Sequence, residues 1–295
     1  MLLIVGSNGL LGRHVVNYFM ATGESVICAS HGSGADIRLD LRMPIGDVAN
    51  IIPEHVTHAL ICSSVTNIDA CYRDPEGTRR FNVTHTIDLL QVLLNRSIQP
   101  IFCSSDLVFK GDIGNYHEDD PRHPTTEYGR QKQTVEDFLL NQEKPFLIIR
   151  MSKLYSLFER DDPSPIGQML NALRDETVIR CAEDQIICPT CVVDIPHAVN
   201  LLLRSKTTGV YHVAAPQQYT RFTLGMRLAK RVGLEHLVQG CSIRDFHFAE
   251  PRPFDNSLNV SRFLSATGFT FTTLEENLPR ILGSREEFAS SNVFP

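Results

Sequence analysis

The sequence predicts an α/β fold, a doubly wound parallel sheet with a smaller C-terminal lobe. Short apolar runs alternate with longer helical patterns through the first half of the chain, as in sheets whose strands are joined by crossover helices. The apolar runs lack polar alternation, which is typical of strands covered by helices on both faces. A glycine-rich turn joins the first run to the first helix, so we expect a sheet of the Rossmann type.

The expected elements follow in order along the chain. Strands are expected at residues 2–5, 25–29, 59–62, 100–103, 146–150 and 210–213. Helices are expected at residues 10–20, 78–95 and 128–140 and around 192–203. The late strand at 210–213 indicates that the chain leaves the sheet after residue 150 and later returns to it.

This order predicts two regions. Residues 1–151 form the dinucleotide-binding Rossmann domain, and residues 192–214 return to it. Residues 152–191 and 215–295 form a substrate-binding lobe over the carboxyl ends of the strands.

The composition narrows the class of protein. The 295 residues are 42% hydrophobic and 21% charged, which is enough apolar material for a core and argues against disorder. A net charge of -6 without a dense Lys/Arg block argues against nucleic-acid binding. No apolar run approaches the length of a membrane span, and the N-terminus lacks the features of a secretory signal. We therefore expect a cytoplasmic protein with a small-molecule substrate.

The eight cysteines are expected to be free thiols. Cys28 and Cys103 lie in apolar runs, where a thiol behaves as a small hydrophobic group. Cys181, Cys188 and Cys191 lie close together but lack a second Cys pair or histidines at zinc-ligand spacing. We expect no metal site.

The glycine-rich turn, Gly6-Ser7-Asn8-Gly9-Leu10-Leu11-Gly12, is the first functional signal. Glycines at this place allow a tight turn and a close approach of a pyrophosphate, which faces the helix N-terminus. We expect cofactor contacts from Gly6, Asn8, Gly9, Leu10, Leu11 and Gly12.

The end of the second strand favours NADP(H) over NAD(H). NAD enzymes place an Asp or Glu there to bind the ribose 2′-hydroxyl, whereas this chain has Ser30-His31. Arg13 could reach a 2′-phosphate, although a solvated first-turn arginine is the plain alternative. The remaining expected cofactor contacts are Asp40, Leu41, Cys62, Ser63 and Ser64.

Tyr128 and Lys132 form the catalytic signal. Their i, i+4 spacing places both side chains on one face of a helix. A cation held near a tyrosine lowers the pKa of its hydroxyl toward neutrality, as acid–base catalysis requires. Ser105 closes the fourth strand, where its hydroxyl could hold a substrate carbonyl.

At these residues the chain resembles the extended short-chain dehydrogenase/reductase family, and within it the dTDP-4-dehydrorhamnose reductases. It is also similar to the NADP-binding regulatory β subunits of methionine adenosyltransferase. The resemblance covers nearly the whole chain. The matching segments are residues 6–12, 66–69, 81–83, 104–109, 128–132, 150–155, 184–190 and 252–253.

The resemblance implies hydride transfer from NADPH to the ketone of a nucleotide-linked 4-keto-6-deoxysugar. Ser105 would bind the carbonyl, Tyr128 would protonate the new alkoxide, and Lys132 would support both Tyr128 and the ribose. Arg252 would contact a substrate phosphate. Further expected substrate contacts are Thr66, Asp106, Lys153 and Gln185. The resemblance also allows a homodimer formed through the helices at 78–95 and from Tyr128.

Two departures from the family pattern concern the substrate. Leu107 stands where the rhamnose reductases have Tyr, and Lys153 stands where they have Trp. Lys153 could instead meet a carboxylate or an extra phosphate, or it could point to solvent. A keto-group reductase is therefore the leading interpretation. The alternatives are a non-catalytic NADP-binding regulatory subunit, and an epimerase or dehydratase of the same family with tightly held NAD.

Overall fold

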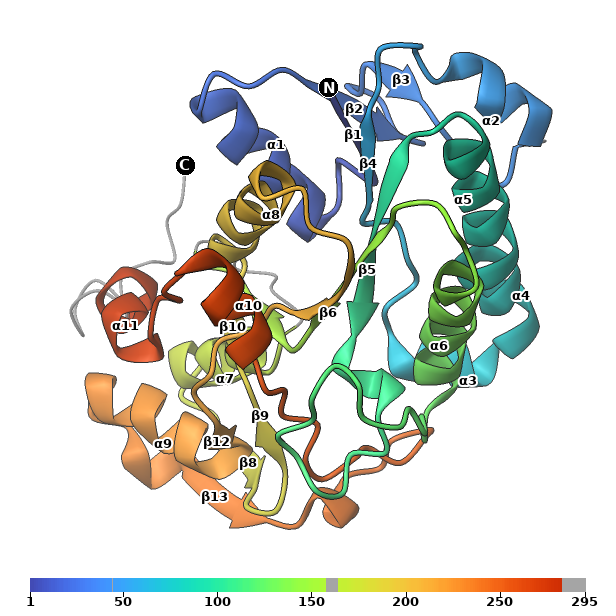
Figure 1. Cartoon of the computed structure of the whole chain (residues 1–295). Coiled ribbons are helices and arrows are strands. Elements are labelled where there is room, and N and C mark those ends of the chain that lie inside the picture. The colour runs from blue at the N-terminus through green and yellow to red at the C-terminus, as the bar shows by residue number, and fades with distance from the viewer. Residues whose placement is uncertain (44, 158–163, 283–295) are drawn as a thin grey trace.

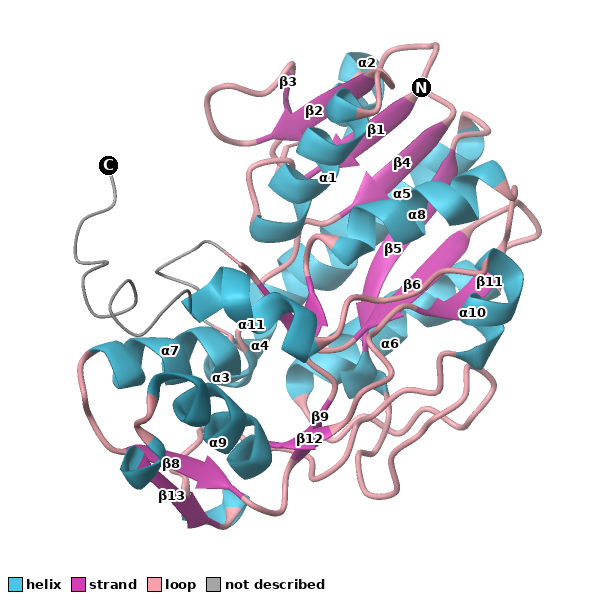
Figure 2. Cartoon of the chain, turned by 90° about the vertical axis from the view of Figure 1, so that its left-hand side faces the viewer, coloured by secondary structure: helices cyan, strands magenta, loops and turns pink. Residues whose placement is uncertain are grey.

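A computed structural model describes residues 1–43, 45–157 and 164–282, and it contains a seven-stranded sheet with helices on both faces (Figures 1 and 2). The strand order is β11-β6-β5-β4-β1-β2-β3, and all six pairings are parallel. The strands are β1 (Leu2–Val5), β2 (Val26–Ser30), β3 (Ile37–Arg38), β4 (His58–Ile61), β5 (Gln99–Ser105), β6 (Leu147–Met151) and β11 (Gly209–His212). The predicted doubly wound parallel sheet is confirmed.

The helices form two layers around this sheet. One layer contains α1 (Leu10–Ala21), α8 (Asp194–Arg204) and α10 (Ser261–Thr267), and the other contains α2 (Ile45–Ile51), α5 (Thr86–Asn95) and α6 (Glu127–Leu140). The short helices α3 (Ile68–Arg73) and α4 (Pro75–Arg79) precede α5. No helix in the described part of the chain is both long and apolar enough to cross a membrane.

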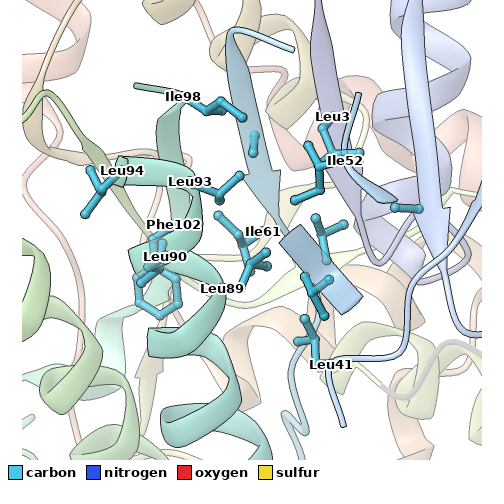
Figure 3. Packing of buried hydrophobic residues seen from close by; sticks show 14 of the residues in the cluster. Leu3, Leu41, Ile52, Ile61, Leu89, Leu90, Leu93, Leu94, Ile98 and Phe102 are labelled. Carbon is cyan, nitrogen blue, oxygen red and sulfur yellow. The ribbon is translucent and has the colours of Figure 1, made fainter. Parts of the chain in front are cut away.

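Each face of the sheet has its own hydrophobic core, because the side chains of a strand point alternately to opposite faces. On β1, Leu3 packs under α2 and α5, whereas Ile4 packs under α1 and α8. Figure 3 shows the first of these cores, where Leu89 and Leu93 of α5 meet Ile61 of β4.

A second lobe has a separate core beside the sheet. Its helices are α7 (Pro165–Arg174), α9 (Arg221–Val232) and α11 (Leu274–Leu282). Its strand pairs are β7 (Leu154–Tyr155) with β10 (Thr190–Cys191), β8 (Ile179–Ala182) with β13 (Val238–Cys241), and β9 (Ile186–Ile187) with β12 (Tyr219–Thr220). Phe263 of α10 and Phe271 pack on the sheet with α8 and not in this core. Both residues fall within the range 215–295 that was assigned to the substrate lobe. The division of the chain into a Rossmann domain and a substrate lobe stays a prediction.

The structure contains elements that periodicity did not predict. β3 has only two residues and forms by pairing with the end of β2, so it has no measurable period. The helix expected at 78–95 changes its winding, because residues Arg80–His85 form a π-helix between α4 and α5. Such local widening often occurs at functional sites.

A buried ion pair joins the central strands to α6. Arg150 of β6 donates through Nε and Nη2 to the carboxylate of Glu136, and the closest contact is 2.7 Å. The Ser104 hydroxyl of β5 donates to the same carboxylate at 2.5 Å. Nη1 of Arg150 donates to the carbonyl of Glu118 and lies 3.3 Å from Nε2 of His212 on β11. Burial and the Arg150 charge lower the pKa of His212 to about 3, so His212 is neutral.

We predict that Glu136→Gln lowers the free energy of unfolding by about 3–5 kcal/mol, because it leaves the buried Arg150 charge uncompensated. Asp137→Asn is the matched control, since the Asp137 side chain is half exposed to solvent and its pair with Arg122 is worth about 0–1 kcal/mol. Urea unfolding followed by circular dichroism measures both variants. Equal effects of the two substitutions would contradict the prediction.

Candidate active site

The loop between β1 and α1 is a cradle that leaves no room for side chains at two glycines. Gly6 has a φ of +88°, and its N–H donates to the carbonyl of Ala29 at 2.8 Å. A Cβ on Gly12 would lie 2.2 Å from the Gly6 carbonyl oxygen, and a Cβ on Gly6 would lie 2.6 Å from Oγ of Ser63. Only bare backbone fits here, so a ligand can approach the main chain closely.

Helix α1 starts without a side-chain cap. Its N-cap is Gly9, so the first-turn N–H groups of Leu10, Leu11 and Gly12 receive no side-chain acceptor from that position. The hydroxyl of Ser7 is buried and makes no hydrogen bond within the described chain. A helix N-terminus with an unused donor beside it fits the pyrophosphate of a dinucleotide.

The end of β2 presents no free carboxylate to the cofactor cradle. Ser30 ends the strand, its hydroxyl accepts from the N–H of Gly32 at 3.2 Å, and the following His31 is exposed. Arg42 holds the Asp40 carboxylate through Nε and Nη2 and lowers the pKa of Asp40 to about 2. Arg13 is exposed on the first turn of α1.

Two predicted cofactor contacts have other partners. The Asn8 side chain donates to the carbonyl of Ser33 at 3.4 Å and so links the loops after β1 and β2. The Leu41 side chain is buried in the core under α5, where Figure 3 labels it. Any contact from Leu41 to a cofactor must come from its main chain.

The loop after β4 is held by a residue that the sequence analysis missed. Asn82, in the π-helix, accepts from the hydroxyl of Ser64 at 3.1 Å and from the N–H of Val65 at 2.8 Å. Its amide donates to Gln131 of α6 at 2.7 Å. The available signal was the family match at residues 81–83, in which Asn82 received no role of its own. Cys62, at the start of this loop, faces Cys103 with 4.0 Å between the sulfurs.

Helix α6 brings Tyr128 to the end of β5. Thr126 caps the helix by accepting from the N–H of Gly129 at 3.1 Å. A Cβ on Gly129 would lie 2.1 Å from the carbonyl oxygen of Leu107, so the helix packs tightly on the turn after β5. Tyr128 is 7% exposed and packs against Leu107. Glu250, which the sequence analysis also missed, accepts from the N–H of Glu127 at 2.9 Å and so anchors this end of α6.

Lys132 lies one turn further along the same helix. Its Nζ donates to the carbonyl of Cys103 at 2.8 Å and lies 5.6 Å from the centre of the Tyr128 ring. Burial lowers the pKa of Lys132 to about 8. The expected lowering of the Tyr128 pKa is wrong for the chain itself, because burial and then the charge of Asp106 raise that pKa.

Ser105 is held by a carboxylate that bridges two strand ends. Its hydroxyl donates to Oδ1 of Asp106 at 2.8 Å, and the Ser152 hydroxyl after β6 donates to Oδ2 at 3.1 Å. Asp106 is 4% exposed, and burial raises its pKa. The predicted substrate residue Asp106 thus orients the predicted catalytic Ser105.

The other predicted substrate residues lie around the junction with the second lobe. Arg252 donates to Asp69 of α3 at 2.8 Å and stacks on Phe248, with 4.4 Å from guanidinium carbon to ring centre. Gln185 is buried and donates to the carbonyl of Pro253 at 3.0 Å. Thr66 is exposed in the loop before α3.

Lys153 and Arg221 lie close enough to Arg252 for its positive charge to lower their pKa values. Lys153 follows β6, and burial together with the charges of Arg252 and Arg221 lowers its pKa. Arg221 begins α9, and its Nε is buried with no hydrogen bond among the described residues. The sequence analysis missed Arg221, which is an ordinary helix-start arginine until the fold brings it to Lys153.

The profile of the RmlD substrate binding domain matches residues 1–286. The chain belongs to this family. Membership confirms the resemblance to dTDP-4-dehydrorhamnose reductases and the class of nicotinamide-dependent oxidoreductase of the short-chain dehydrogenase/reductase type.

Proteins with different names are similar to this chain. The probable low-salt glycan biosynthesis reductase Agl14 of Haloferax volcanii is 28% identical over 97% of this chain and 99% of its own length. Methionine adenosyltransferase 2 subunit beta of Xenopus laevis is 25% identical over 88% of this chain and 80% of its own length. The crystal structure of dTDP-4-dehydrorhamnose reductase from Bacillus anthracis in complex with NADP superposes with a TM-score of 0.83. It is 22% identical and covers 95% of this chain and 97% of that one.

We predict that Gly12→Ala weakens NADPH binding by about tenfold or more, roughly 1.4 kcal/mol, because the new Cβ would push the loop out of shape. Gly46→Ala is the control, since a Cβ at Gly46 meets no atom within 4 Å. Fluorescence titration with NADPH measures both, and a melting curve shows whether each variant is folded. Unchanged affinity in a folded Gly12→Ala protein would contradict the assigned cradle.

Proposed function

We propose that this chain is an NADPH-dependent reductase that transfers a hydride to a keto group, most simply that of a nucleotide-linked 4-keto-deoxysugar or a related polar metabolite. The observation that carries the proposal is that α6 sets Tyr128 and Lys132 beside the end of β5, where Lys132 donates to Cys103 and Tyr128 packs on Leu107, on either side of Ser105 in the chain. The glycine cradle lies at the same edge of the sheet. The second lobe is proposed to bind the rest of the substrate.

Two features of the chain would hold the cofactor. The bare backbone of Gly6 and Gly12 and the uncapped start of α1 suit its pyrophosphate. Lys132 would hydrogen-bond the nicotinamide ribose. When bound, NADPH supplies the hydride and leaves as NADP⁺.

Tyr128 would donate the proton that completes the reduction. Its burial favours the neutral hydroxyl, which is the form that can give a proton to the oxygen of the reduced carbonyl. The Lys132 ammonium would then stabilise the phenolate that remains. Ser105, already aligned by Asp106, would contact the reacting oxygen.

We predict that Tyr128→Phe lowers kcat by about 100-fold or more, because general acid catalysis contributes about that much. NADPH affinity should change less than threefold, since the ring and the neighbouring lysine remain. NADPH oxidation with a panel of nucleotide-linked 4-ketosugars measures the first quantity and fluorescence titration the second. A Tyr128→Phe variant with full turnover would contradict the assignment of Tyr128 as the proton donor.

NADP(H) is proposed over NAD(H), with Arg13 as the contact to the 2′-phosphate. The support is the Ser30-His31 strand end together with an exposed arginine on the first turn of α1. Arg13→Ala should weaken NADPH binding about tenfold or more, the worth of a charge-assisted hydrogen bond, and leave NADH binding unchanged. Titration with NADPH and with NADH checks this prediction. Equal losses of affinity for the two nucleotides would contradict a contact between Arg13 and the 2′-phosphate.

A regulatory subunit is the second candidate. It is favoured by the similarity to the methionine adenosyltransferase subunit and by the hydroxyl of Ser105, whose proton is donated to Asp106. Tight NADPH binding, no turnover on any ketone and a stoichiometric enzyme partner would together support this candidate.

A further inference from the structure

Lys153 stands at the sheet edge where the reaction is proposed to occur. Met151, two residues earlier, pairs with Ser105 in the register of β6 and β5. The intervening Ser152 donates to Asp106, the carboxylate that also holds Ser105. The main chain of Lys153 is fixed as well, because its carbonyl accepts from the N–H of Thr190 at 2.8 Å.

Among the described residues, the ammonium group of Lys153 has no close counter-ion. No hydrogen bond or ion pair joins its Nζ to another side chain in the parts of the chain that the structure describes. Its side chain is largely buried, and removing a charge from water is costly unless a partner replaces the water. Asp106 attracts it from beyond ion-pair distance, but that carboxylate already accepts from two hydroxyls.

The surrounding charges are mainly positive. Arg252 and Arg221 both act on Lys153, and Arg252 is neutralised by Asp69. Lys153 and Arg221 therefore remain as two cations without a paired carboxylate within the described chain. They come from different elements, Lys153 from the end of β6 and Arg221 from the start of α9 in the second lobe. Two such cations on different elements suit a ligand with two anionic groups.

We propose that Lys153 selects a sugar with a carboxylate attached to the carbon next to the reacting one, so that the preferred substrate is a nucleotide-linked keto-uronate. The inference rests on the proposed nucleotide-sugar reductase function. The diphosphate would lie toward Arg221 and Arg252, and the carboxylate would supply the missing partner of Lys153 near Ser105. A neutral 6-deoxy or hydroxymethyl group would leave the buried ammonium unpaired.

The test compares two ligands that differ only in the sugar substituent, UDP-glucuronate and UDP-glucose, with the full-length protein saturated with NADP⁺. Isothermal titration of the unaltered protein should give at least tenfold tighter binding of UDP-glucuronate. Lys153→Met should remove this preference and leave UDP-glucose affinity within threefold. Lys153→Arg should retain most of the preference. If Lys153 had only a structural role, its substitution would not change the ratio of the two affinities.

The outcomes separate the two proposals. Equal binding of both ligands by the unaltered protein, or equal loss of both in Lys153→Met, overturns carboxylate selection; the second result would assign Lys153 to the shared diphosphate. Either result leaves the nucleotide-sugar function in place. If the NADP⁺ complex binds neither ligand and no matching dTDP-sugar, the proposed function itself fails. The Arg80→Met variant, altered on the exposed side of the π-helix, should bind both sugars as the unaltered protein does.

Discussion

The buried pair of Arg150 and Glu136 fixes where the proposed chemistry can occur. Glu136 lies one helical turn beyond Lys132 and two beyond Tyr128, so the contacts of its carboxylate set the rotation and height of α6. Those contacts come from β5 through Ser104 and from β6 through Arg150. A charge pair with both partners buried is costly to break and tolerates little displacement. The face of α6 that carries Tyr128 and Lys132 therefore stays aligned with the strand that carries Ser105.

A second group of polar contacts closes the site from the other lobe. Glu250 accepts from the N-terminal turn of α6, and Arg252 reaches Asp69 of α3. Both residues lie in the segment that follows β13, the last strand of the second lobe. This segment therefore ties that lobe to α6, which carries Tyr128, and to α3. The second lobe, α3 and α6 are in this way held together by short, directional interactions.

The electrostatics of the site suit reduction. Burial keeps the Tyr128 hydroxyl protonated, and it also lowers the proton affinity of Lys132 without neutralising it at pH 7, since its pKa is about 8. The charge of Asp106 acts on both Tyr128 and Lys153, and burial raises the pKa of Asp106. The lysine that lowers a tyrosine pKa in the simple scheme is here directed at the carbonyl of Cys103. In the chain itself, burial and the charge of Asp106 raise the pKa of Tyr128.

The sequence by itself determined six of the seven strands of the large sheet, the glycine cradle, the Tyr128–Lys132 pair and Ser105. Each of these depends on local spacing: an apolar run, a turn that only glycine allows, or one turn of helix. Only the tertiary structure decided the roles of Asn82, Arg150, Arg221 and Glu250, whose partners lie between 14 and 123 residues away in the chain. It also decided that Leu41 belongs to the core, and that Asp106 holds Ser105 as well as facing Lys153. The physical reason is that a buried polar group must be satisfied by whatever the fold brings near it, and no local pattern records that neighbour.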